Sequence, residues 1–357
     1  MSMRPLIAAI RTQYLRDNYL LAKRQHGGRV LAVLKANGYG HDAARCAQAL
    51  ADVADGFAVA CLEEALQLRA AGVSAPILLL EGVFEAAELA EVERHRLWLV
   101  VQSEEQLRML EEAQPAAPFR VWLMLDSGMH REGFLPQHYR AAWERLQASG
   151  KAESIVKMTH FARADEPTVP MTLAQIETFD AATAGLPGEE SVANSAGILC
   201  HPRSRRDWGR AGILLYGASP LPAGFPQGDA LKPVMRLRSR IFSVRELAAG
   251  EPIGYGNNFV TDRPTRVGLI AGGYADGYPR LASSGSPVAV DGRRSRIIGR
   301  VSMDMITVDL SDLPAAGIGS EVELWGDTVS VNEVAAAAGS IAYELLCNIK
   351  RAHFVFE

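Results

Sequence analysis

The sequence predicts an α/β protein: a (β/α)8 TIM-type barrel followed by a mainly antiparallel β domain. In the first two thirds of the chain, eight short runs rich in Val, Ile and Leu alternate with stretches of helical periodicity. These runs are continuous, as expected of strands buried on both faces of a parallel sheet. Eight such units in about 220 residues fit a closed barrel. Alternation alone leaves an open, doubly wound sheet as the alternative.

The eight runs are the predicted barrel strands. In chain order they are Val30–Lys35, Gly56–Ala60, Ile77–Gly82, Leu97–Val101, Phe119–Leu125, Ile155–Phe161, Ser191–Ser195 and Gly212–Gly217. Between them, the spacing of apolar residues predicts helices over residues 61–71, 103–113 and 172–184. The second of these helices opens with Ser103 and has Gln106 three residues on, which is the spacing of a capping box.

Beyond residue 217 the pattern changes to β-branched stretches separated by turns. A segment rich in Pro, Gly and Ala at 219–228 predicts a linker, so we expect domains at 1–222 and 223–357. Asp291-Gly292 between two apolar runs predicts a hairpin. Further strands are expected at 305–310 and 322–325, and the one helix predicted in this domain is Val331–Ala338.

Composition excludes several classes of protein. The 37 basic and 41 acidic residues give a net charge of −4, which argues against a nucleic-acid partner. The four cysteines lie far apart without CxxC spacing, so we expect neither a metal site nor a disulfide framework. Apolar runs are too short to span a bilayer, and the N-terminus lacks the apolar segment of a secretion signal. A soluble, cytoplasmic protein of two domains fits best.

Several polar side chains stand where predicted strands end, which is where barrel enzymes build their active sites. Lys35 closes the first strand, and burial there would favour its neutral, nucleophilic amine. The alternative is a lysine that extends into solvent. The Gly38-x-Gly40 pattern that follows also matches a loose dinucleotide fingerprint, which leaves a dehydrogenase open. Arg131 and His160 follow later strands, and each alone is typical of a surface charge or a structural histidine.

The end of the barrel region offers groups for an anion. Arg210 lies directly against an apolar strand, and a half-buried guanidinium needs an acceptor. Ser195 and the backbone amides around Gly212 and Ile213 suit a phosphate ester, which barrels often bind near their last two strands. In the second domain, glycines flank Tyr255 and Tyr274, which indicates tight turns that present a ring.

The segment Val33–His41 resembles the signature of the pyridoxal-phosphate-dependent alanine racemases. Further segments resemble the same family in the same order, namely residues 127–131, 194–195, 210–213, 254–256, 273–277 and 302–305. The resemblance runs over nearly the whole chain. The compact length is most similar to the catabolic, proteobacterial branch of the family.

The resemblance implies a homodimer in which each active site combines the barrel of one subunit with the β domain of the other. It also implies that the N-terminal segment Leu6–Ile10 joins the β domain. Lys35 would form the Schiff base with pyridoxal 5′-phosphate. The phosphate would be held by Tyr39, Ser195, Gly212 and Ile213. Arg210 would face the pyridine nitrogen with His160 behind it, and the substrate would be bound by Arg131, Tyr274, Met303 and Asp304.

Racemisation removes the α-proton on one face of the substrate and returns one on the other, so it needs two bases. Lys35 is one candidate, and the resemblance makes Tyr255 of the partner subunit the other. Met124 stands where the family usually has a carbamylated lysine that orients the substrate-binding arginine. A thioether cannot hold Arg131 in that way. The alternatives are therefore a racemase of broad amino-acid specificity, or a weakly active or non-catalytic homologue that binds the cofactor.

Overall fold

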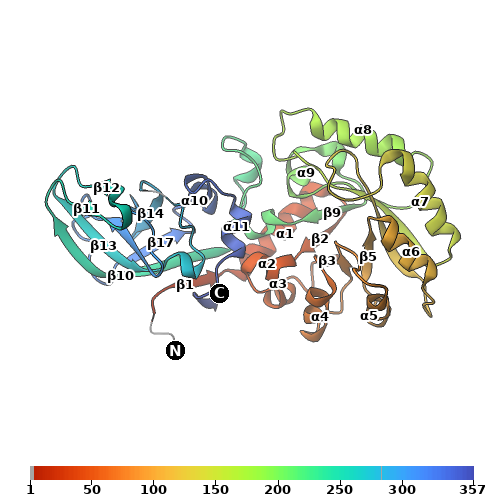
Figure 1. Cartoon of the computed structure of the whole chain (residues 1–357), viewed down its shortest axis with the longest axis horizontal. Helices are drawn as coiled ribbons and strands as arrows, with labels where there is room; N and C mark the ends of the chain where they lie inside the picture. The colour runs from red at the N-terminus through yellow and green to blue at the C-terminus, as the bar shows by residue number, and fades with distance from the viewer. Residues whose placement is uncertain (1–3, 283) are drawn as a thin grey trace.

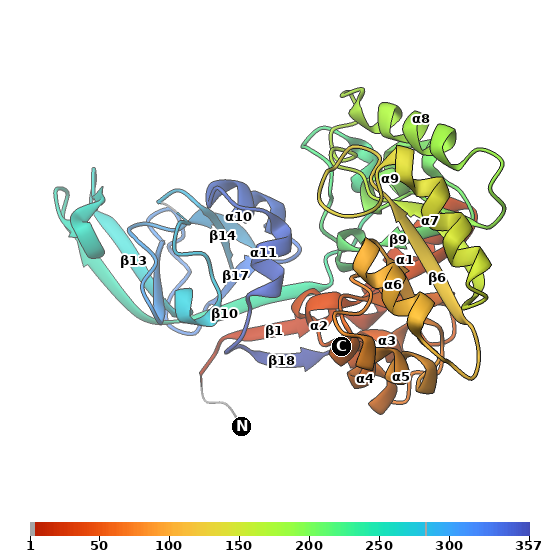
Figure 2. The same cartoon turned by 45° about the vertical axis from the view of Figure 1, so that its right-hand side comes forward.

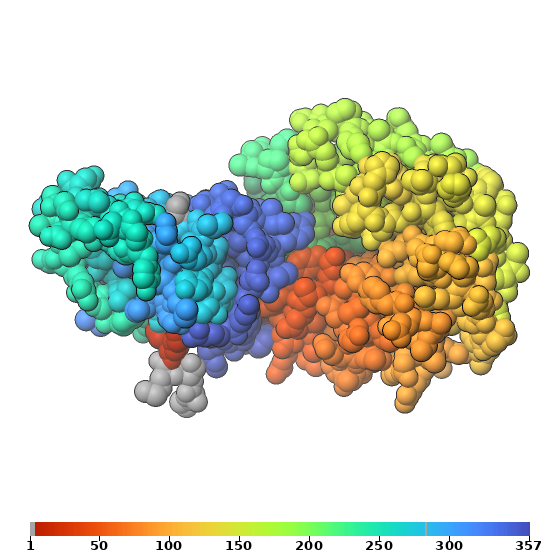
Figure 3. Space-filling view, viewed as in Figure 1, coloured from red at the N-terminus to blue at the C-terminus, as the bar shows by residue number. Residues whose placement is uncertain are grey.

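The computed structural model describes residues 4–282 and 284–357, and it consists of two lobes (Figures 1 and 3). One lobe is a closed barrel of eight parallel strands, which confirms the predicted fold class and excludes the open sheet. The strands are β2 (Arg29–Val33), β3 (Gly56–Val59), β4 (Ile77–Leu79), β5 (Trp98–Val101), β6 (Phe119–Leu125), β7 (Ala152–Thr159), β8 (Glu190–Ser191) and β9 (Trp208–Ala211).

Helices connect the barrel strands and cover the outside of the barrel (Figure 2). They are α1 (Thr12–His26), α2 (Lys35–Gly40), α3 (Ala43–Ala49), α4 (Leu62–Ala70), α5 (Leu89–Arg94), α6 (Glu104–Glu112), α7 (Pro136–Ala148), α8 (Met171–Thr183) and α9 (Ser195–Cys200). Short 3-10 turns are η1 (Ala86–Glu88), η2 (Pro202–Ser204), η3 (Ile213–Tyr216) and η4 (Pro226–Gly228). Ser103 caps α6 as predicted, because its side chain accepts a hydrogen bond from the backbone N–H of Gln106.

Three tryptophans fill the barrel. Trp98, Trp122 and Trp208 have ring centroids 5.5 to 6.2 Å apart. Strand β9 neighbours neither β5 nor β6 in the sheet, so rings from these strands can meet only across the barrel interior. This plug of aromatic side chains makes the barrel a packed core rather than a channel.

The prediction for the eighth strand was wrong. Residues 213–216 form the 3-10 turn η3, and the strand is β9, which precedes it. The run Ile213–Tyr216 is apolar because it is buried, and a short buried turn cannot be distinguished from a buried strand by periodicity alone. Two other boundaries shift: Lys35 opens α2 rather than closing a strand, and Ser195 opens α9.

The second lobe is a mainly antiparallel β domain. Its strands are β1 (Ile7–Ile10), β10 (Met235–Leu247), β11 (Pro252–Ile253), β12 (Phe259–Val260), β13 (Thr265–Ala271), β14 (Pro287–Val290), β15 (Arg293–Arg296), β16 (Met305–Asp309), β17 (Glu321–Trp325) and β18 (His353–Phe356). Strand β1, although N-terminal, pairs antiparallel with β10 and parallel with β18. Strands β11 and β12 form a separate two-stranded sheet.

Two predictions for the β domain had different outcomes. The hairpin is confirmed: β14 and β15 pair around Asp291 and Gly292, which both have positive φ, as a type I′ turn requires. The prediction of a single helix was wrong, because α11 (Ala342–Cys347) follows α10 (Val331–Ala337). Helix α11 is only six residues long and is stabilised by packing against α2 of the barrel.

The long strand β10 connects the two lobes (Figure 1). It begins beside the barrel, since the N–H of Val234 donates to the carbonyl of Tyr216. Its 13 residues span about 40 Å at the usual rise of a strand. The β11–β12 hairpin therefore lies at the end of the β domain that is remote from the barrel, as both ribbon views show (Figures 1 and 2). None of the helices in the described ranges combines the length and hydropathy that a bilayer span needs.

Candidate active site

Lys35 opens a backbone turn of unusual conformation. Residues 36–39 all have φ between 50° and 64° and ψ between 41° and 48°, which is a left-handed turn. Ala36, Asn37 and Tyr39 are not glycines, and each such residue costs about 1–2 kcal/mol in this conformation. Strain of this kind persists only where surrounding contacts hold it, and it concentrates at functional sites.

Hydrogen bonds from several elements hold the lysine turn. The N–H of Ala36 donates to Oε1 of Glu64 at 2.7 Å, and Asn37 Oδ1 accepts from the N–H of Ala43 at 3.0 Å. The β domain also supports the turn, because a side chain at Gly40 would collide with the carbonyl of Leu346 on α11. The barrel and the β domain of one chain thus fix Lys35 together.

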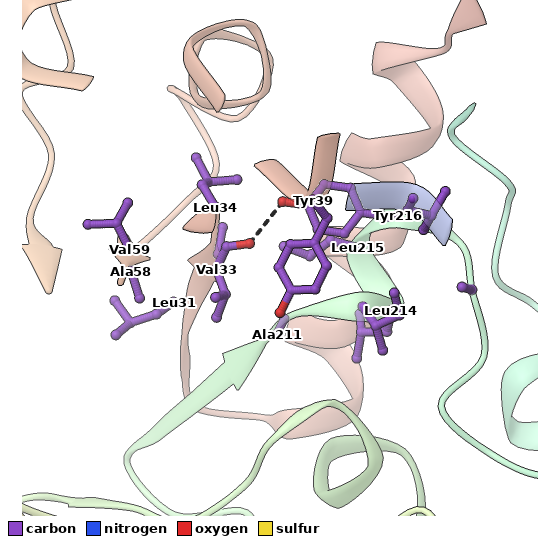
Figure 4. Packing of buried hydrophobic residues seen from close by; sticks show 14 of the residues in the cluster. Leu31, Val33, Leu34, Tyr39, Ala58, Val59, Ala211, Leu214, Leu215 and Tyr216 are labelled. Carbon is purple, nitrogen blue, oxygen red and sulfur yellow. Dashed lines mark hydrogen bonds between the residues drawn. The ribbon is translucent and has the colours of Figure 1, made fainter. Parts of the chain in front are cut away.

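Tyr39, at the end of the lysine turn, lies beside the start of η3. Its ring is buried and stacks on Tyr216 with centroids 4.7 Å apart, while the Tyr216 hydroxyl donates to the carbonyl of Val33 at 2.9 Å (Figure 4). Burial raises the pKa of the Tyr39 hydroxyl, so it stays protonated and can donate a hydrogen bond. The Tyr39 hydroxyl lies close to Gly212, because a Cβ added to that glycine would be 2.9 Å from the hydroxyl oxygen.

Ser195 completes this small cradle, which we define as Tyr39, Ser195, Gly212 and Ile213. The Ser195 hydroxyl accepts a hydrogen bond from the N–H of Gly212 at 2.9 Å. Asn194 caps α9 and holds Ser195 at its first turn. Ile213 follows Gly212 as the first residue of η3 and is buried. Two hydroxyls and the start of a helical turn converge at a glycine, which is an arrangement suited to an anion.

Arg210 lies beside this cradle on β9 and is buried. Nη1 donates to the carbonyl and the hydroxyl of Ser191, and Nη2 donates to the carbonyl of Thr159 at 2.6 Å. Burial lowers the pKa of Arg210 to about 10, which leaves the guanidinium protonated at neutral pH. No described residue accepts a hydrogen bond from its Nε.

His160 follows β7 with its Nδ1 3.5 Å from Nη2 of Arg210. Desolvation, together with the positive charges of Arg210, Arg131 and Lys35, lowers the pKa of His160 to about 3. The imidazole is therefore neutral at physiological pH. Because the charges of Arg210, Arg131 and Lys35 all act on the pKa of His160, the three cations lie close to it. The side chains predicted to meet at the strand ends of the barrel are therefore near one another.

Arg131 stands on the loop after β6 and is half exposed. Asp126 shapes this loop by accepting hydrogen bonds from the N–H groups of Gly128 and His130, each at 3.0 Å. Arg131 is not free, contrary to the expectation drawn from Met124. Its Nη2 donates to Oε1 of Glu132 at 2.6 Å.

The site residues of the β domain form a separate, exposed group. The N–H of Tyr274 in η6 (Tyr274–Asp276) donates to the carbonyl of Ser302, and Ala275 donates likewise to Met303. Met303 is about half exposed, and the carboxylate of Asp304 accepts from Arg351 at 3.0 Å. Tyr255 opens η5 (Tyr255–Asn257) between β11 and β12 and is 69% exposed.

Within one chain, the structure brings the barrel residues together but does not bring Tyr255 to them. In the described ranges, the Tyr255 hydroxyl forms no hydrogen bond with another residue. Lys35 belongs to the barrel lobe, beside which β10 begins, whereas Tyr255 follows the far end of β10 in the β11–β12 hairpin, remote from the barrel (Figure 1). The sequence reasoning also missed Glu64, Thr159, Ser191 and Glu132, which support the site. Only the strand-end position of Thr159 could have indicated one of them.

A buried arginine, an anion cradle and a lysine on a strained turn, at the C-terminal face of a barrel, define an enzyme site for a phosphorylated cofactor. Comparison with known proteins narrows this class. Residues 10–220 match the sequence model described as "Alanine racemase, N-terminal domain", and residues 234–355 match "Alanine racemase, C-terminal domain". The chain belongs to the alanine racemase family.

Individual relatives agree along their full length. An alanine racemase of Azoarcus sp. is 60% identical over 352 residues, and one of Neisseria gonorrhoeae is 57% identical over 354 residues, with 99% of each chain covered in both cases. The biosynthetic alanine racemase of Pseudomonas aeruginosa superposes with a TM-score of 0.96 at 48% identity, over 99% of this chain and 100% of that one. The enzyme from Bartonella henselae, with covalently bound pyridoxal phosphate, gives a TM-score of 0.88 at 30% identity, over 99% of each chain.

The comparisons do not favour the dehydrogenase that the Gly38-x-Gly40 pattern left open. The Gly38-x-Gly40 pattern lies on the left-handed lysine turn of a closed barrel, not at the first turn of an open nucleotide-binding sheet. The described residues contain no cluster of His, Cys, Asp or Glu that could hold a metal ion.

Proposed function

We propose that this protein interconverts L-alanine and D-alanine with pyridoxal 5′-phosphate, using Lys35 and the partner subunit's Tyr255 as its two acid–base groups. The observation that carries the proposal is the left-handed turn that joins Lys35 to Tyr39 of the cradle, with the charges of Lys35 and Arg210 both acting on His160. The full-length similarity to alanine racemases supports the choice of substrate.

The residues present fit the cofactor. Gly212 leaves a space that a Cβ would fill, between the hydroxyls of Tyr39 and Ser195, and a phosphate group there would receive hydrogen bonds from both. Ile213 would add its backbone N–H at the first turn of η3. Arg210 retains Nε as a donor for a ring nitrogen, and His160 stays neutral behind it. When bound, the cofactor delocalises the negative charge that forms on the substrate α-carbon.

The chain's own groups would move the protons. Lys35 would carry the cofactor covalently and, once released by the substrate, would exchange the α-proton on one face. The hydroxyl of the partner subunit's Tyr255 would do so on the other face. Arg131 would bind the substrate carboxylate, while Tyr274, Met303 and Asp304 of the partner would shape the end of the substrate pocket. Because Arg210 stays protonated at neutral pH, it can donate to the ring nitrogen but cannot accept its proton.

The proposal therefore includes a homodimer. Tyr255, Met303 and Tyr274 are large side chains that a single chain leaves exposed, as expected if a partner subunit covers them. A two-fold dimer would bring each β domain to the opposite barrel and form two equal sites. We also propose a division at residue 222 and a cytoplasmic location. The four cysteines, which form no disulfide, support that location.

The direct test is incubation of the purified holoenzyme with L-alanine, followed by chiral chromatography. We expect D-alanine to accumulate to near equality, since the two enantiomers have equal free energy in solution. Parallel incubations with larger amino acids distinguish an alanine enzyme from a broad racemase. Complete failure to form D-alanine by a holoenzyme that contains the cofactor would overturn the proposal in favour of a cofactor-binding homologue.

A further inference from the structure

Glu132 carries a negative charge near two cations of the barrel site, Arg131 and Arg210. Its carboxylate binds Nη2 of Arg131 at 2.6 Å, and its negative charge acts on the pKa of Arg210 in the direction that keeps that guanidinium protonated. Its side chain is 21% exposed, compared with 54% for Arg131. Glu132 is therefore a partly buried anion that pairs with Arg131 and whose charge also acts on Arg210.

Glu132 and Met124 line the same small cavity. Its volume is about 10 Å³, its walls include Asp126, Met129 and His160, and it can hold at most about one water molecule. Asp126 is already engaged, since its two oxygens accept from Gly128 and His130. Met124 offers no charge, so Glu132 is the carboxylate in this cavity that binds Arg131.

The backbone fixes Glu132 in this place. The N–H of Phe134 donates to the carbonyl of Met124, and the N–H of Asp126 donates to the carbonyl of Phe134, both at 2.9 Å. The N–H of Gly133 donates to the carbonyl of Gln102 at 3.1 Å. Glu132 therefore stands on a loop whose backbone is held by hydrogen bonds, and its carboxylate pairs with Arg131 without any ligand present.

We propose that Glu132 is a positioning residue that holds Arg131 in the orientation in which it binds the substrate carboxylate. The hydrogen bond to Glu132 occupies Nη2 of Arg131, which leaves Nη1 and Nε of Arg131 for a ligand. The anchor reduces the conformational entropy that a long, exposed arginine loses when it binds. This inference rests on the proposed function, because that function makes Arg131 the group that meets the carboxylate.

The test compares Glu132→Gln and Glu132→Asp with a matched control, Glu105→Gln. Glu105 also pairs with a neighbouring exposed arginine, Arg108 at 3.0 Å, but on α6 outside the site. For each holoenzyme, calorimetry gives the dissociation constant of propionate, a carboxylate without the amino group, and kinetics give KM and kcat for alanine. Thermal unfolding and cofactor absorbance show whether the fold and the loading are intact.

We expect Glu132→Gln to weaken propionate binding and to raise KM for alanine about tenfold, with a smaller change in kcat. Glu132→Asp should lie between this variant and the parent, while Glu105→Gln should match the parent. Unchanged propionate binding and KM in Glu132→Gln would overturn the inference. So would tighter binding, because Glu132 would then repel the substrate carboxylate rather than position its receptor. If the parent itself forms no D-alanine, the proposed function fails, whereas parental activity with an unaffected Glu132→Gln refutes only the role of Glu132.

Discussion

The two lobes of this chain present their site residues in opposite ways. In the barrel, Tyr39, Ser195 and Arg210 are buried, hydrogen-bonded and held before any ligand arrives. In the β domain, Tyr255 and Met303 are exposed on short turns. The difference fits the proposed dimer, in which the barrel of one subunit supplies one half of each active site and the β domain of the second subunit supplies the other half.

The largest expected effect comes from the barrel half. Lys35→Ala should lower racemisation at least about 10⁴-fold, because it removes both the covalent attachment point and one acid–base group. The measurement is the initial rate of D-alanine formation, together with the visible absorbance of the purified protein. Lys151→Ala, on the outer surface of the barrel, is the control and should keep the parental rate. Substantial activity in Lys35→Ala would show that Lys35 is not needed for the reaction, and would contradict the role assigned to the barrel.

The second largest effect comes from the β-domain half. Tyr255→Phe should lower the rate about 10²–10⁴-fold, the usual contribution of a general acid–base group, with cofactor content unchanged. Tyr14→Phe on α1 removes a hydroxyl outside the site and should have no effect. A Tyr255→Phe enzyme as fast as the parent would mean that the exposed tyrosine contributes only to packing.

A smaller effect tests how tightly the cradle is built. In Gly212→Ala, the new Cβ would approach the Tyr39 hydroxyl to 2.9 Å, and the stacked, buried ring cannot easily move away. We expect cofactor affinity to fall about tenfold to hundredfold, in line with overpacking costs of 1–3 kcal/mol. Fluorescence titration of apoenzyme with the cofactor measures this. Gly317→Ala in the β domain, where a Cβ has room, should bind like the parent.

The smallest effect concerns acid stability of the barrel. Burial lowers the pKa of His41 to about 4, below its unfolded value of about 6.5, so the folded state disfavours the proton. The stabilisation is full above pH 6.5 and is lost as pH falls toward 4, by up to about 1.4 kcal/mol per pH unit. His41→Asn should flatten this part of the curve of unfolding free energy against pH. An unflattened slope in His41→Asn would contradict the assignment.

The same contrast explains how much the sequence could predict. Lys35, Arg131 and His160 were expected to meet because parallel strands of a barrel end at one face, and they do. The left-handed turn at residues 36–39 was not predicted, since Asn37 and Gly38 tolerate positive φ but Ala36 and Tyr39 disfavour it, and contacts with Glu64 and α11 hold it in place. The pairing of Arg131 with Glu132 is a choice between side-chain rotamers, which sequence spacing does not determine.

The shared site can be tested by mixing two inactive subunits. Lys35→Ala and Tyr255→Phe chains are co-expressed with different tags, and the mixed dimer is isolated. One of its two sites then combines an intact Lys35 with an intact Tyr255, while the other site carries both changes. We predict that the mixed dimer regains about half the parental rate per dimer, or about one quarter in an unseparated equal mixture. A mixed dimer as inactive as its two parents would contradict the account, because each active site would then be built from one chain.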